Sequence, residues 1–206
     1  MTSDLRRDLI PNDDALQLID ALNAMKDKLR AAAQNWELLD ETGHVPAAPS
    51  YTALLQHATD AQDLSRDVLG LTADFARSLH PATGIGIGIG IGIGIGIGIG
   101  IGITVLKHLG TASTMSSHAA PLFTETAERA LSLSRSADPT DRYYLANHMV
   151  VDHASARAYL RRTSESLRDA ARELDDHLSV RRFLATLTRP VGRPTPPPPR
   201  PSGRHR

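Results

Sequence analysis

The sequence predicts an all-α protein: an antiparallel four-helix bundle with a Gly-Ile repeat between its second and third helices and a disordered Pro/Arg-rich C-terminal tail. Four segments of the 206-residue chain carry apolar stripes, and in the first two the apolar residues recur at steps of three and four, the spacing that places side chains on one face of a helix. Outside the repeat, no segment has the alternation that is typical of a strand. Two short connections rich in turn residues indicate that consecutive helices run antiparallel.

The first two helices are expected within residues 12–83, which form an acidic helical hairpin. Gly43 and Pro46 should end the first helix, and Pro81 should end the second, which is expected to start near Ser50. The apolar stripes are Leu18, Leu22, Met25, Leu29, Ala32, Trp36 and Leu39 in the first helix and Leu54, Ala58, Ala61, Leu64, Val68, Leu71, Phe75 and Leu79 in the second.

The last two helices are expected within residues 104–188, a basic helical hairpin of the same bundle. Pro121 predicts a kink or a restart in the third helix, because proline lacks the backbone donor that a helix interior uses. Asp138 and Pro139 have the residue types of an N-cap and a first helical position. The stripes are Val105, Leu106, Leu109, Met115, Leu122, Phe123, Ala127, Ala130 and Leu131 in the third helix and Leu145, Met149, Asp152 or His153, Ala156, Leu160, Thr163, Leu167, Ala170, Leu174 and Leu178 in the fourth.

The charges are balanced over the whole chain but not within its halves. Lys plus Arg and Asp plus Glu number 23 each, yet residues 1–83 hold 7 basic and 13 acidic side chains, and residues 104–206 hold 16 and 10. The two hairpins should therefore attract each other. Residues 1–11, before the first hairpin, are expected to form an N-terminal arm. The chain has no cysteine, which excludes disulfides and thiolate nucleophiles, and its first residues lack an apolar signal segment. We expect a cytoplasmic protein.

Ten Gly-Ile pairs fill residues 84–103, a low-complexity segment with three interpretations. Residues 84–106 have the length of a membrane span, but half of the repeat is glycine, which weakens a helix by about 1 kcal/mol per residue. Strict alternation favours a strand, which would have no ladder partner in a helical bundle. The favoured interpretation is a linker that expanded by slippage, because lengthening a loop costs little entropy.

Candidate catalytic and metal-binding chemistry is sparse. The metal candidates are two acid-histidine clusters on the fourth helix, with His148, Asp152 and His153 in one and His177 in the other. The sequence lacks the Glu-x-x-His pattern of di-iron bundles and any HExxH motif, so a metal site is not favoured and no cofactor is expected. It also lacks a nucleophile elbow and a phosphate-binding loop, so we expect no enzyme.

The C-terminal end offers two kinds of binding chemistry. Residues 189–206 hold seven prolines and no acid, and Arg193, Pro196 and Pro199 fit the R-x-x-P-x-x-P spacing that docks on aromatic grooves. The arginines of this end would alternatively contact phosphates of a nucleic acid. The candidate partner or phosphate contacts are Arg181, Arg182, Arg189, Arg193 and Arg200.

The block HLGTASTMSSHAAPLFTETAERALSLSRSADPTDRYYLANHMVVDHASARAYLRRTSESLRDAARELDDHL, residues 108–178, resembles uncharacterised all-helical hypothetical proteins of actinobacteria. The resemblance covers most of residues 10–185. It implies a helical fold and a cytoplasmic setting, and it implies no activity. Such proteins would carry a short mixed linker where this chain has the repeat.

Three functions follow as expectations. The first is a non-catalytic, coiled-coil-like helical bundle that acts through contacts with an unknown protein partner or a second copy of itself. The second is a nucleic-acid-associated protein that uses the Arg-rich last helix and tail. The third is a membrane-anchored protein with residues 84–106 as the span.

Overall fold

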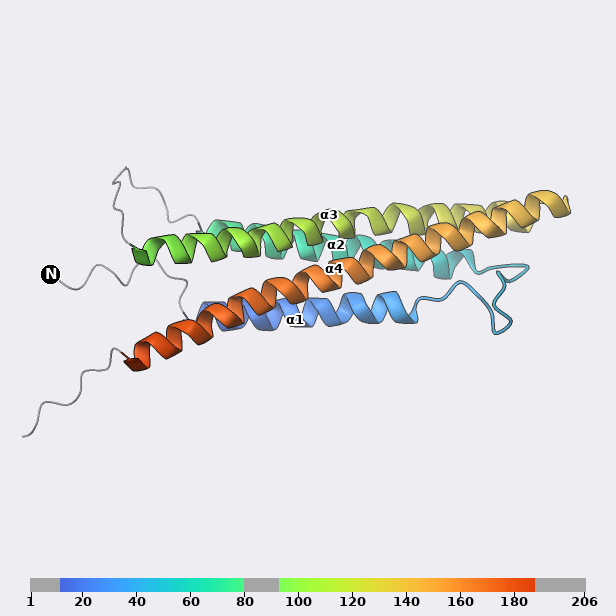
Figure 1. Ribbon diagram of the computed structural model, residues 1–206. Helices are drawn as coiled ribbons and strands as arrows, with labels where there is room; N and C mark the ends of the chain where they lie inside the picture. Colours follow the sequence, from blue (N-terminus) through green and yellow to red (C-terminus); the bar gives the residue numbers. More distant parts are fainter. Residues whose placement is uncertain (1–11, 80–92, 188–206) are drawn as a thin grey trace, which may run out of the picture.

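The computed structural model describes residues 12–79 and 93–187, and within these ranges every regular element is an α-helix. The four helices are α1 (Asn12–Asn35), α2 (Tyr51–Leu79), α3 (Ile93–Arg135) and α4 (Pro139–Leu187). They run alternately up and down along one long axis, so each is antiparallel to its neighbours in the chain (Figure 1). The predicted all-α, antiparallel four-helix bundle is therefore confirmed.

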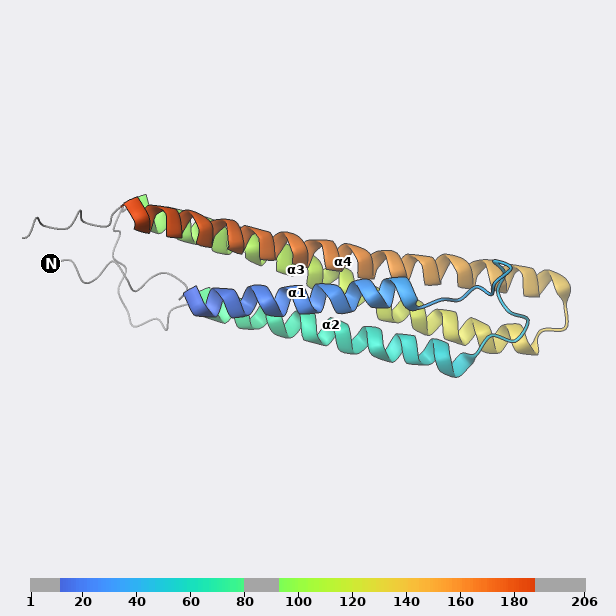
Figure 2. The same ribbon diagram turned by 90° about the horizontal axis from the view of Figure 1, so that it is seen from below.

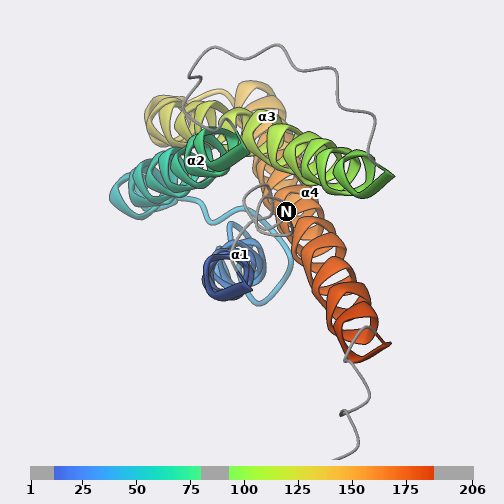
Figure 3. The same ribbon diagram turned by 90° about the vertical axis from the view of Figure 1, so that its left-hand side faces the viewer.

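The helices do not close into an evenly packed ring. α3 packs closely against both α4 and α2, and α1 packs on α4, whereas α1 and α2 touch at few positions. Viewed along the axis, α1 lies apart from α2, and the C-terminal part of α4 leans away from α2 (Figure 3). Each acidic helix thus packs mainly on a helix of the basic pair.

α1 ends earlier than the sequence predicts. It stops at Asn35, and Leu38 is buried in place of the expected Leu39, which is 40% exposed. The reason is tertiary: the Arg157 guanidinium of α4 donates from Nε to the carbonyl of Ala33 at 2.7 Å and so takes up an acceptor at the end of α1.

A short ordered loop follows α1. The Asp40 carboxylate accepts hydrogen bonds from the backbone N–H of Thr42 at 2.9 Å and of His44 at 3.1 Å. Gly43 has a φ of +80°, a conformation that favours glycine. This loop places Trp36, directly after α1, beside α2.

The predicted starts of α2 and α4 are confirmed. Ser50 Oγ accepts the backbone N–H of Ala53 at 3.3 Å, and Asp138 Oδ1 accepts that of Thr140 at 2.9 Å, so both residues cap helix N-termini. Pro139 is the first residue of α4, where its missing N–H costs nothing.

The start of α3 differs from the prediction. The helix begins at Ile93, not near Val105, so the second half of the repeat is helical; residues 84–92 lie outside the described residues. The end of the repeat packs on α2, where Gly102 is buried so close to Leu79 that an added Cβ would lie 2.7 Å from Leu79 Cδ2. The helix also continues through Pro121 without the predicted restart.

Small side chains bring α3 close to its neighbours. Ala112, Ser116 and Ala119 are fully buried, although the predicted stripe placed the half-buried Met115 among the core positions. Hydroxyl groups bridge α2 and α3, with Thr72 Oγ1 2.9 Å from Ser113 Oγ. The predicted stripe of α4 is accurate, because every member from Met149 to Leu178 lies in the core. Of the two alternatives Asp152 and His153, His153 is the buried one.

Candidate functional site

The open seam between α1 and α2 forms a groove on the described part of the molecule. Two hollows of about 430 and 350 Å³ lie along it, and Lys28 of α1 and Asp67 of α2 line both. They are therefore parts of one feature, which we call the α1–α2 groove. In the view from below, the axes of α1 and α2 diverge toward the C-terminal end of α1 (Figure 2). Its further lining residues are Ala31, Ala32, Asn35, Trp36, Asp60, Asp63 and Leu64 in the larger hollow and Ala21, Ala24, Met25, Arg66, Gly70, Leu71 and Asp74 in the smaller one.

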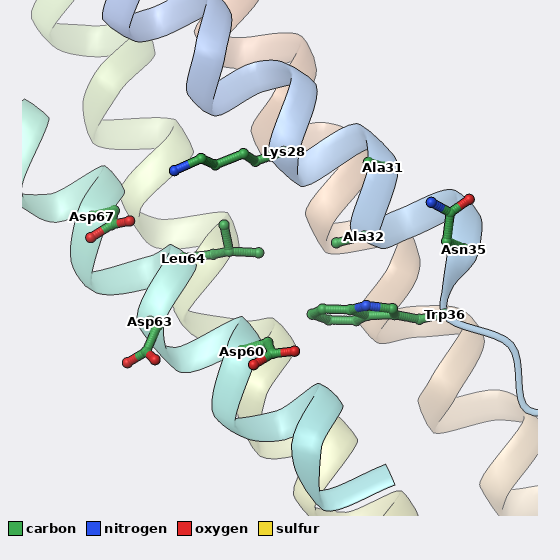
Figure 4. Close-up of a pocket in the computed structure, with 9 residues that line it drawn as sticks. All are labelled: Lys28, Ala31, Ala32, Asn35, Trp36, Asp60, Asp63, Leu64 and Asp67. Carbon is green, nitrogen blue, oxygen red and sulfur yellow. The ribbon is translucent and has the colours of Figure 1, made fainter. Parts of the chain in front are cut away.

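The groove has an apolar base and an acidic edge. Ala32, Leu64 and Trp36 come together in the larger hollow, where the Trp36 ring projects from the end of α1 toward α2 (Figure 4). The α2 side carries four aspartates, which are Asp60, Asp63, Asp67 and Asp74. A segment that fills the groove would meet apolar surface below and carboxylates at one side.

The aspartates of α2 differ in their partners. Asp60 accepts a hydrogen bond from Gln56 Nε2 at 2.6 Å, and Asp63 pairs with Arg66 at 2.6 Å. Asp74 pairs with Arg77, one turn further along the helix. Asp67 is exposed and has no hydrogen bond or ion pair within the described residues, so its charge is available to a ligand. Lys28 extends from α1 toward it, as Figure 4 shows.

Trp36 joins the groove to a cluster of rings in the core. Its indole stacks on the His57 imidazole, with centroids 4.9 Å apart and planes inclined by 7°. Phe123 packs edge-on against Trp36 at 5.1 Å and against His153 at 5.3 Å. Each ring comes from a different helix or its end, so this cluster connects all four helices.

Two histidines of this cluster each have a buried ring nitrogen without a hydrogen-bond partner among the described residues. The His57 and His153 rings lie 6.1 Å apart, and neither His57 Nδ1 nor His153 Nε2 has a hydrogen-bond partner in the described part of the chain. Burial, with smaller contributions from the charges of His57 and Arg157, lowers the pKa of His153 from 6.5 to about 4. Burial also lowers the pKa of His57, against the opposing effect of Asp60. Both imidazoles are therefore neutral at pH 7.

The predicted metal candidates do not assemble. His148 is exposed, Asp152 is bound by Arg129 of α3, and His153 points into the core. His177 lies about 36 Å along the helix from His153. Within residues 12–79 and 93–187, no group of three or more potential ligands has a metal-binding arrangement.

The predicted arginine contacts fall at and beyond the end of α4. Arg182 is exposed on the last turns of that helix, and Arg181 belongs to the same helix. Arg189, Arg193 and Arg200 lie outside the described residues. The phosphate-contact hypothesis stays a prediction. As for the membrane hypothesis, no helix in the described ranges is both long and apolar enough to cross a bilayer.

The sequence contains a signal for His57, which lies outside the predicted apolar stripe of the second helix. His57 follows Leu54 by three positions and precedes Ala61 by four, so it shares their helix face. The groove had no comparable signal, because it depends on which helices pack together. Comparison of the chain with protein-family models, with curated proteins and with solved structures gives no match.

Proposed function

We propose that the protein is a non-catalytic helical bundle that binds a basic, partly apolar segment of a partner protein along the α1–α2 groove. The observation that carries this proposal is the open seam. In a closed four-helix bundle, α1 would also pack closely on α2. Here α1 packs on α4 instead, so the facing surfaces of α1 and α2 stay partly uncovered.

The chemistry of the groove favours a protein segment over a nucleic acid. The aspartates of α2 would repel phosphates, whereas they would attract lysine or arginine side chains that reach over the edge. Trp36 and Leu64 offer the kind of apolar contact that anchors a bound peptide or helix. The unpaired Asp67 carboxylate, which lines both hollows, would bind a basic side chain of the partner segment and so orient that segment in the groove.

Peptide selection tests this proposal. A random peptide library would be selected against the full chain and against a version in which residues 189–206 are replaced by a Gly-Ser segment of equal length. We expect the enriched peptides to carry net positive charge and to change the emission of Trp36, the single tryptophan of the chain.

Matched substitutions locate the binding site. Ala31→Phe places a ring in the groove from an exposed position of α1, and Ala154→Phe makes the same change at an exposed position of α4 outside the groove. Binding should weaken about tenfold or more with Ala31→Phe and stay unchanged with Ala154→Phe. Equal binding to both variants, or no enriched peptide on either version of the chain, would contradict the proposal.

A further inference from the structure

We propose that residues 189–206 of the same chain occupy the α1–α2 groove, so that a partner segment must displace the chain's own tail. This inference rests on the proposed function and names the internal competitor for that site. The groove is lined by residues that the described chain leaves uncovered, and the tail has complementary charge, composition and length.

Charge complementarity is the first support. The groove contains four aspartates against two basic residues, Lys28 and Arg66, and so has a net negative charge. The tail carries five arginines and no acid. Arg66 is already paired with Asp63 and Arg77 with Asp74, and Asp60 accepts a hydrogen bond from the neutral Gln56, which leaves Asp67 as the aspartate best able to receive an incoming guanidinium. An arginine fits a carboxylate in a bidentate manner that a lysine cannot offer.

The composition of the tail suits a groove with an exposed aromatic ring. Four consecutive prolines, Pro196–Pro199, favour the extended polyproline conformation, which loses little entropy when it binds. At about 3.1 Å per residue, this run lies about 28 to 37 Å beyond Leu187. Arg157, which contacts Ala33 near the end of α1, lies about 45 Å before the end of α4, so the residues that follow the proline run, and not the run itself, can reach the larger hollow at Trp36.

The tail is long enough to reach the groove. α4 ends at Leu187, at the end of the bundle where α1 begins and α2 ends (Figure 1). The 19 residues that follow would span about 59 Å at about 3.1 Å per residue. α2 itself is about 44 Å long at 1.5 Å per residue, so the tail can pass around α1 and still lie along the seam.

Tethering gives the tail an advantage over a free ligand. A segment joined to its own site is present at an effective concentration of about 1 mM, so even weak contacts keep the groove covered. The apparent affinity of a partner then equals its intrinsic affinity multiplied by the fraction of chains whose groove is open. The tail would act as an internal competitor that selects for partners with a stronger anchor.

Acrylamide quenching of Trp36 tests occupancy in the full chain. We compare the unchanged chain with the triple variant Arg189→Ser/Arg193→Ser/Arg200→Ser. The matched control is Arg161→Ser/Arg162→Ser/Arg172→Ser, which removes the same charge from exposed positions of α4. The quenching constant should rise about twofold in the tail variant and stay unchanged in the control, and added salt should raise it only in the unchanged chain and the control. Equal quenching of all three proteins would overturn the inference.

A spin label distinguishes the chain's own tail from that of a second copy. Because the chain has no cysteine, Ser202→Cys provides a single attachment site at the tail. The label should broaden the backbone amides of Lys28, Leu64 and Asp67 within one molecule. In an equal mixture of spin-labelled chains and isotope-labelled chains without spin label, broadening of the same amides would show exchange between copies and would overturn the inference.

The two experiments separate this inference from the proposed function. If selected peptides bind the groove and the tail label broadens no groove amide, the inference fails and the proposed function stands. If the label broadens the groove amides and no peptide is enriched on the Gly-Ser version, the groove serves only an internal contact and the proposed function fails.

Discussion

Replacement of His153 by Leu should make the protein less sensitive to acid. In the folded chain the pKa of His153 is about 4, against 6.5 for an exposed histidine, so the unfolded chain binds more protons between these two pH values. The free energy of unfolding therefore falls as the pH falls from about 6.5 toward 4. At 1.36 kcal/mol per pKa unit, the full loss is about 3 kcal/mol, of which about 2 kcal/mol has gone at about pH 5.

The neighbours of His153 fix the sign of this effect. Phe123 and Trp36 surround the imidazole pair with apolar rings, and Arg157 adds a positive charge on the same helix. Within the part of the chain that the structure describes, Asp60 is the carboxylate that favours protonation, and it acts on His57. The two histidines also oppose each other's protonation, so their contributions to acid sensitivity do not simply add.

Urea unfolding followed by circular dichroism measures the effect. The difference in unfolding free energy between His153→Leu and the unchanged chain should grow by about 2 kcal/mol in favour of the variant between about pH 7.5 and 5. His148→Leu removes an exposed histidine from the same helix and serves as the control. If His153→Leu lost as much stability over this range as the unchanged chain, the buried imidazole could not be the cause.

Two further predictions concern helix contacts. Arg157→Met should destabilise the protein by about 2 kcal/mol and speed amide hydrogen exchange mainly in α1, because Arg157 donates at 2.7 Å to the carbonyl of Ala33; uniform acceleration in all four helices would argue against a local role. Gly110→Ala should stabilise α3 by about 1 kcal/mol, since nothing lies within 4 Å of the new Cβ. Gly102→Ala should gain less, because the Leu79 side chain must move away; equal melting temperatures for the two variants would contradict the observed packing of the repeat on α2.

Helix starts were predictable because they depend on local chemistry. A serine or aspartate that caps its own helix, as Ser50 and Asp138 do, needs no distant residue. The end of α1 was not predictable, since Arg157 lies more than 120 residues away in the chain. The candidate site was not predictable for the same reason, because the spacing of apolar residues does not show that α1 packs on α4 and not on α2.

The sequence by itself determined that the protein is helical, how many helices it has, and nearly every core position of α4. These properties follow from apolar spacing and capping residues, which act within a few turns. The tertiary structure alone decided that half of the repeat is helical, that His57 meets His153, and that the seam between α1 and α2 stays open. A stripe fixes which face of a helix is apolar, but the packing of all four helices decides which neighbour covers that face and which part is left uncovered.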